Sequence, residues 1–252
     1  MIRKPFVGGN WKCNGSRSSA QALATALTGW DASAVEVVVA PPFVHFDLVK
    51  SAFNETCHPA ICSQDISANA NGAFTGEVSA EMLVDSGIKY TLIGHSERRH
   101  KFGESLADTA AKVSQAHAHG ICTVLCVGET LEQRKAGETE AICDAQLSAV
   151  LTSVKDWSQV VIAYEPVWAI GTGVVATTEQ AQEAHAGIRK TLAAKVSEAV
   201  ADSTRIIYGG SVTDSNSSEL WKCEDVDGFL VGGASLKAAG FVQIIKSVHL
   251  AK

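Results

Sequence analysis

The chain has 252 residues, of which 46% are hydrophobic and 19% are charged, and its formal net charge is −6. This composition is typical of a globular protein and excludes a disordered or collagen-like chain. A net negative chain offers no general attraction for polyphosphate backbones or anionic lipid, so neither nucleic acid nor a membrane is expected as a partner.

Eight short apolar or β-branched segments are expected to form strands. Most of them are continuously apolar rather than alternating, which is typical of parallel strands that helices cover on both faces. In chain order they are residues 6–11, 35–40, 61–64, 91–94, 122–127, 160–164, 205–208 and 228–231.

The segments between these strands carry the signals of helix ends. Thr177 with Gln180, and Thr130 with Gln133, each match a capping box, in which two side chains pair with backbone N–H groups at a helix start. Glycine is favoured just after a helix. Helices are therefore expected to end near Gly29, Gly87, Gly120 and Gly137.

Apolar residues at helical spacing predict the faces that two of these helices bury. One stripe follows the predicted helix start at Thr177, and the other precedes the fifth strand. They consist of Ala184, Ile188, Leu192 and Val196, and of Leu106, Ala110 and Val113.

Strand and helix alternate eight times, with no low-complexity linker and no shift in composition. Strict alternation implies βαβ units, so we expect residues 1–252 to form a single α/β domain. Eight units in a chain of this length fit a closed, eight-stranded parallel (β/α)8 barrel, and an open doubly wound sheet is the alternative.

The cysteines and the first residues bear on location. Seven cysteines cannot all pair within one chain, and none are spaced C-x-x-C. Arg3 and Lys4 precede only the short apolar run Phe6-Val7, which is far shorter than a secretory or transit segment. No run approaches the roughly 18 apolar residues of a membrane span. We therefore expect free thiols and a cytoplasmic location.

Polar residues follow several predicted strands, at the end of a barrel where chemistry is found. Asn10 and Lys12 follow the first strand, His95 the fourth and Glu165 the sixth. Each of these residues alone is more often a solvated or structural residue. Together they bring an amide, a fixed cation, an imidazole and a base to one face, which favours a catalytic site.

Glycine-rich turns follow the last two strands. Gly209, Gly210 and Ser211 come after the seventh strand, and Gly232 and Gly233 come after the eighth. Barrels commonly bind phosphate at this place, through backbone N–H groups and the start of a short extra helix. A phosphate ester is therefore the expected substrate.

Other ligand motifs are absent or misplaced. No G-x-x-x-x-G-K-[ST] loop for nucleoside triphosphates occurs. Residues 171–176 match the loose dinucleotide pattern G-x-G-x-x-A, but they do not directly follow a predicted strand. His117 and His119 would point to different faces of a helix, and Cys122 and Cys126 match neither a zinc finger nor a redox motif. No cofactor and no metal are expected.

Five sequence blocks, in order along the chain, resemble the triosephosphate isomerase family. They are GNWK at 9–12, GHSERR at 94–99, AYEPVWAIGTG at 163–173, YGGSV at 208–212 and GFLVGGASL at 228–236. The resemblance implies the TIM barrel fold and the interconversion of dihydroxyacetone phosphate and D-glyceraldehyde 3-phosphate through an enediolate.

The resemblance also implies roles for the strand-end residues. Glu165 would be the base that moves a proton between adjacent substrate carbons, and His95 the electrophile, a neutral donor at a helix start. Lys12 would neutralise phosphate and enediolate charge, with Glu97 as its ion partner. Asn10 would be a further donor to the developing oxyanion.

Residues 166–173 resemble the closing lid of the family, whose closure would exclude water and suppress loss of phosphate from the enediolate. Gly171 would donate its N–H to the phosphate, which Ser211, Gly232 and Gly233 would also bind. The lid residues are Pro166, Val167, Trp168, Ala169, Ile170, Gly171, Thr172 and Gly173.

Residues 64–79 resemble the long loop that the family inserts into a partner subunit. A homodimer is implied, with Cys13 and Thr75 at its interface. From the residues alone, this segment is only an unusually long loop.

Two other functions remain open at this point. One is a different phosphosugar barrel enzyme, for example an aldolase that uses Lys12 as a Schiff-base nucleophile. The other is a non-catalytic phosphosugar-binding protein. Glu165 and His95 argue against the second, because binding alone does not need a base opposite an electrophile.

Overall fold

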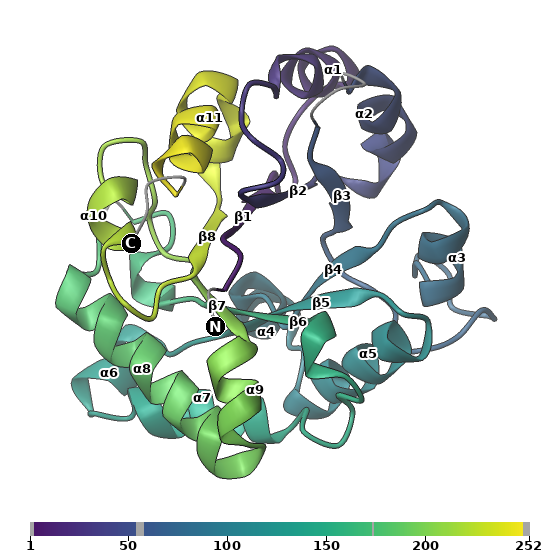
Figure 1. The fold of residues 1–252 in the computed structure, drawn as a ribbon. Coiled ribbons are helices and arrows are strands. Elements are labelled where there is room, and N and C mark those ends of the chain that lie inside the picture. The colour runs from purple at the N-terminus through teal and green to yellow at the C-terminus, as the bar shows by residue number, and fades with distance from the viewer. Residues whose placement is uncertain (1–2, 54–57, 173, 249–252) are drawn as a thin grey trace.

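The structure is a computed structural model that describes residues 3–53, 58–172 and 174–248. Its eight parallel strands close into a barrel in sequence order, and helices surround the strands (Figure 1). The strands are β1 (Phe6–Asn10), β2 (Glu36–Ala40), β3 (Ala60–Ser63), β4 (Tyr90–Ile93), β5 (Cys122–Val127), β6 (Val160–Tyr164), β7 (Arg205–Tyr208) and β8 (Gly228–Val231).

The predicted closed barrel is confirmed, and the open sheet is excluded, because β1 pairs with β8 as well as with β2. Strands β5 to β8 have their predicted bounds, and β1 to β4 differ from them by one residue at one or both ends. The fourth strand, for example, stops before Gly94, whose φ of 72° leaves the extended region.

Helices follow the strands where the capping signals predict them. Both capping boxes, at Thr130 and Thr177, are present, and the four predicted stop glycines all have positive φ. The α-helices are α1 (Arg17–Ala26), α2 (Phe46–Ala52), α3 (Ala80–Asp85), α4 (Ser96–Phe102), α5 (Leu106–Ala118), α6 (Leu131–Lys135), α7 (Thr139–Ser148), α8 (Thr178–Lys195), α9 (Glu198–Ser203), α10 (Ser217–Trp221) and α11 (Ala238–Ser247), and the 3₁₀ helices are η1 (Phe43–His45), η2 (Trp157–Gln159), η3 (Val167–Ala169) and η4 (Gly233–Leu236).

The buried apolar residues form two clusters, one inside the barrel and one between the strands and the helices. Ile188 and Leu192 lie in the outer cluster as predicted, and so does Val113. Leu106 does not, because it opens α5 at the rim of the barrel, where its side chain is 38% exposed. Among the described residues, no helix has both the length and the apolar character needed to cross a bilayer.

Candidate active site

The predicted strand-end residues surround one cavity of about 300 Å³ at the C-terminal end of the barrel. The residue before α4 and the segments after β1, β6, β7 and β8 supply its walls. All eight residues predicted to be catalytic or to bind phosphate line it: Asn10, Lys12, His95, Glu165, Gly171, Ser211, Gly232 and Gly233.

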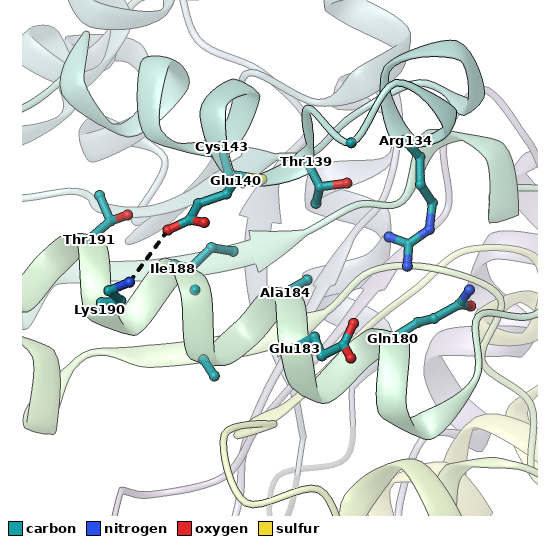
Figure 2. Close-up of a pocket in the computed structure, with 13 residues that line it drawn as sticks. Arg134, Thr139, Glu140, Cys143, Gln180, Glu183, Ala184, Ile188, Lys190 and Thr191 are labelled. Carbon is teal, nitrogen blue, oxygen red and sulfur yellow. Dashed lines mark ion pairs between the residues drawn. The ribbon is translucent and has the colours of Figure 1, made fainter.

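A larger cavity, of about 480 Å³, lies on the flank of the barrel between α7 and α8 (Figure 2). Its walls come from helices and their adjoining turns, and the Glu140 carboxylate there faces the Lys190 ammonium at 3.9 Å. No strand end contributes to its lining. Because barrel chemistry takes place at the strand ends, the smaller cavity is the candidate active site.

Lys12 has a strained backbone that hydrogen bonds with Asn10 and Gln64 hold in place. Among the residues that the structure describes, it alone combines a side chain with positive φ, at 52°. Its N–H donates to Oδ1 of Asn10 at 3.0 Å, and its carbonyl accepts from Nε2 of Gln64 at 2.8 Å. Its Nζ lies 3.1 Å from Oε1 of Glu97, as predicted. The two hydrogen bonds fix the backbone of Lys12 and the ion pair with Glu97 fixes its Nζ, so together they position the ammonium group.

His95 is both the N-cap of α4 and a neighbour of Glu165. Its Nδ1 accepts a hydrogen bond from the backbone N–H of Glu97 at 3.1 Å, and its Nε2 lies 3.0 Å from Oε1 of Glu165. A backbone N–H can donate only to an unprotonated ring nitrogen, so this geometry selects a neutral imidazole with its hydrogen on Nε2. The expected neutral donor is thus consistent with the contacts.

Glu165 is 2% exposed, yet it is held as a carboxylate. Burial raises the pKa of the carboxyl, but the adjacent His95 imidazole, hydrogen bonds from His95 and Ser96, and Lys12 lower that pKa by more, so it lies below its ordinary value. The Ser96 N–H donates to Oε2 at 2.8 Å. A buried, ionised carboxylate is the state that a base requires.

The glycines of the two turns leave space for other site groups. A Cβ on Gly209 would lie 3.0 Å from Cγ of Glu165, and a Cβ on Gly232 would lie 3.7 Å from Cε of Lys12. The 3₁₀ helix η4 begins at Gly233, where a short helix was predicted. The Lys12 side chain therefore passes beside the turn expected to bind phosphate.

The lid prediction covers residues 166–173, of which Gly173 lies outside the described residues. Residues Pro166 to Ile170 form η3 with its caps, and Gly171 has φ of 69°. The Ser211 hydroxyl donates to the carbonyl of Ala169 at 2.7 Å. The glycine-rich turn after β7 therefore contacts the predicted lid directly.

Glu129 was not among the predicted site residues, although it contacts Trp168 of the predicted lid. It is fully buried and accepts hydrogen bonds from the Tyr164 hydroxyl and from Nε1 of Trp168, the latter at 3.0 Å. Arg134 pairs with its Oε1 at 3.2 Å and stacks over the Trp168 ring at 5.1 Å. The sequence did contain one signal for this residue. Glu129 is a polar residue two positions after β5, and the predicted site residues also follow strands.

The residues predicted at a subunit interface, Cys13 and Thr75, are both exposed in the single chain. Cys13 lines a cavity of about 240 Å³, whose walls also include Lys12, Gln64 and Phe102. Their place in an interface stays a prediction.

The chain matches the family model described as triosephosphate isomerase over residues 5–248. The chain belongs to the triosephosphate isomerase family. It is 54% identical over 250 residues to the cytosolic triosephosphate isomerase of Oryza sativa subsp. japonica, covering 98% of both chains. It is 49% identical over 249 residues to the triosephosphate isomerase of Neurospora crassa, covering 98% of this chain and 99% of that one.

A chloroplastic triosephosphate isomerase of Arabidopsis thaliana is 51% identical over 246 residues, which are 97% of this chain and 78% of the relative. Membership of the triosephosphate isomerase family confirms the isomerase activity predicted from the five sequence blocks. It favours that activity over the Schiff-base aldolase and over a non-catalytic binding protein.

Proposed function

We propose that Glu165 is the base of the isomerisation and His95 its electrophile. The observation that supports this most directly is the 3.0 Å approach of His95 Nε2 to Glu165 Oε1 in the wall of one cavity. An ionised carboxylate there can take a proton from a substrate carbon and return it to the adjacent carbon. A neutral imidazole beside it can donate to the carbonyl oxygen as negative charge develops on that oxygen.

Lys12 and Asn10 complete the stabilisation of charge in this proposal. The Lys12 ammonium reaches from β1 past Gly232 toward the site, and Asn10 fixes the Lys12 backbone through Oδ1. A fixed cation near both the enediolate and the phosphate lowers the energy of each negative group without reorganising during the reaction.

The phosphate would bind at the backbone of Gly171, Ser211, Gly232 and Gly233. These residues line the same cavity, and η4 begins at Gly233. Movement of the lid over this point would then exclude water from the enediolate. The cavity volume limits the size of the substrate, because the phosphate and the reacting carbons must fit within about 300 Å³.

Deuterium incorporation separates these roles from the aldolase mechanism. Dihydroxyacetone phosphate converted in heavy water is expected to yield glyceraldehyde 3-phosphate with deuterium at C2, and Glu165→Gln is expected to abolish both conversion and exchange. Borohydride added with substrate is expected to leave the mass of Lys12-containing peptides unchanged. A reduced adduct on Lys12 would establish Schiff-base chemistry instead.

We infer that the protein works as a homodimer. The segment between β3 and α3 extends from the barrel with Phe74 45% exposed and Thr75 also exposed, and Met82 on α3 is 52% exposed. Apolar side chains at a loop tip are typical of a surface that another chain covers. A second copy of this chain, seated near Cys13, is the proposed partner.

We propose a cytoplasmic location. The 54% identity to a relative named as cytosolic supports it. Fractionation of cells that express the chain is expected to recover the isomerase activity with soluble cytoplasmic markers, whereas recovery in an organelle would contradict the proposal.

A further inference from the structure

Arg99 lies directly behind the pair formed by His95 and Glu165. Its guanidinium donates to the carbonyl of Gly94 at 2.7 Å, to the carbonyl of Cys126 at 3.2 Å and to the Thr109 hydroxyl at 3.1 Å. Gly94 follows β4 and Cys126 belongs to β5, so one side chain ties two adjacent strands together just below the site. Gly94, whose φ is 72°, has no Cβ, and a Cβ there would meet this guanidinium.

The charge of Arg99 is not matched by a carboxylate in contact with it. Within the described ranges, no acidic oxygen lies within 4.0 Å of its guanidinium, whereas the preceding residue, Arg98, pairs with both Asp65 and Glu104. Burial lowers the pKa of Arg99, and the carboxylates of Glu165 and Glu104 act in the opposite direction. The partners of the half-buried guanidinium are two carbonyls and a hydroxyl, so no contacting carboxylate of the described residues neutralises its charge.

Glu165 is the carboxylate of the site that interacts electrostatically with Arg99. Arg99 and Glu165 line the same small space, together with Gly94, Ser96 and Cys126. Glu165 is also bonded to β5, the strand that Arg99 contacts at Cys126, because the Glu165 N–H donates to the carbonyl of Val127 at 2.7 Å. Because Glu165 is buried and Arg99 is half-buried, their attraction is screened less than that of two exposed charges.

We propose that Arg99 is a positioning residue of the isomerisation, which ties the ends of β4 and β5 together and keeps the buried Glu165 side chain ionised. The proposal rests on the proposed role of Glu165 as base.

Arg99 acts on Glu165 beside other groups, since hydrogen bonds from His95 and Ser96 and the Lys12 cation also lower the pKa of Glu165. Lys12, from the end of β1, contacts Glu97 at 3.1 Å, so much of its charge is matched. His95 donates from Nε2 as a neutral ring, and the buried Cys126 thiol, whose pKa burial raises, carries no charge. Arg99 is the cation here whose hydrogen bonds go only to neutral acceptors.

The test compares Arg99→Met, which removes the charge, with Arg99→Lys, which keeps it. Thr109→Val is the matched control, because it removes one of the hydrogen-bond partners of Arg99 and leaves the guanidinium in place. The carboxyl carbon-13 resonance of Glu165, assigned by its absence from Glu165→Gln, reports ionisation directly. Circular dichroism defines the pH range over which each variant stays folded.

We expect Arg99→Met to raise the pKa of Glu165 by about one pH unit, and Arg99→Lys and Thr109→Val to leave it nearly unchanged. A Glu165 titration that is the same in Arg99→Met and wild type overturns the electrostatic proposal. So does a shift of the same size in Thr109→Val, since that would assign the effect to packing.

A kinetic measurement separates this inference from the proposed base. The substrate is D-glyceraldehyde, whose lack of a phosphate group removes an ionisation near pH 6. The acid limb of its kcat/KM profile is expected to move with the carbon-13 titration. If the carbon-13 titration moves and the kinetic limb does not, Arg99 acts on Glu165 as proposed but Glu165 is not the base.

Discussion

The side-chain amide of Gln64 donates a 2.8 Å hydrogen bond to the backbone carbonyl of Lys12, the residue with the strained backbone. The same amide donates to the carbonyl of Ala40 at 2.8 Å, so it links the ends of β1 and β2. The ammonium group of Lys12 therefore depends for its position on a residue from the end of β3. Strain at a functional residue persists only where neighbours hold it in this way.

Gln64→Met is expected to lower the free energy of unfolding by about 2 kcal/mol, because two carbonyls lose their donor. It is also expected to lower kcat/KM by about tenfold, since small displacements of a positioned group are costly. Urea unfolding and a coupled isomerase assay measure the two effects. Gln133→Met, which removes a helix cap, is the control, and an equal loss of kcat/KM there would refute the specific role of Gln64.

Glu165→Asp withdraws the carboxylate by about one methylene. We expect kcat to fall by on the order of a hundredfold or more while KM stays within a few-fold, because a misplacement of about 1 Å can cost about 10²-fold. Steady-state kinetics in both directions check this, with the exposed Glu132→Asp as control. Near-normal turnover of Glu165→Asp would remove Glu165 from the role of base.

His95→Gln keeps a side-chain donor but not the imidazole that approaches Glu165. Affinity for glycerol 3-phosphate, a ground-state analogue, is expected to change by less than about threefold, and kcat to fall by about 10²-fold or more. Calorimetric titration and steady-state kinetics give the two quantities. An affinity loss larger than the loss of kcat would mean that His95 mainly binds the ground state.

The buried His185, on α8, is expected to make the free energy of unfolding sensitive to acid. Burial lowers its pKa from an ordinary 6.5 to about 4, so the folded protein holds a neutral ring. Below pH 6.5 the unfolded chain binds a proton that the folded chain does not. The contribution of neutral His185 to the free energy of unfolding is therefore fully present above pH 6.5. It falls as the pH drops toward 4, by about 3 kcal/mol in all.

Unfolding free energies of wild type and His185→Asn at pH 7 and pH 4.5, at one protein concentration, test this. The wild type is expected to lose more stability on acidification than His185→Asn, which has no imidazole to protonate. Parallel losses would show that other groups cause the acid sensitivity.

Thr75→Arg is expected to dissociate the proposed dimer and to lower kcat, because a bulky cation at the loop tip obstructs a neighbouring chain. Sedimentation velocity and activity, measured on the same samples, check this. Thr28→Arg, at an exposed position beyond the end of α1, controls for surface charge. A dimeric, fully active Thr75→Arg would place the interface elsewhere.

The barrel could be predicted from the sequence because buried parallel strands are continuously apolar, and four of eight strands had their bounds predicted to the residue. The site followed from the same pattern, since polar residues such as Glu165 come directly after strands. Leu106 was misjudged because helical periodicity identifies a face but not whether another element covers it.

Gln64, Arg99 and Glu129 escaped prediction for a different reason. Their contacts join segments from different strands, and nothing in their local sequence marks those partners. The left-handed backbone of Lys12 was equally hidden, because positive φ is ordinarily signalled by glycine. The bond to Asn10 is local, but only the assembled barrel adds the bond from Gln64 that helps to hold the conformation.

The pairing of β1 with β8 has a consequence during synthesis. The last strand begins at residue 228, so a nascent chain that has not yet delivered it exposes the unpaired backbone edges of β1 and β7. Such edges can pair with other chains, and the contact that covers them joins distant parts of the sequence, which is slow to form. The completed barrel has no free edge, so the hazard of edge-to-edge aggregation is confined to the interval before closure.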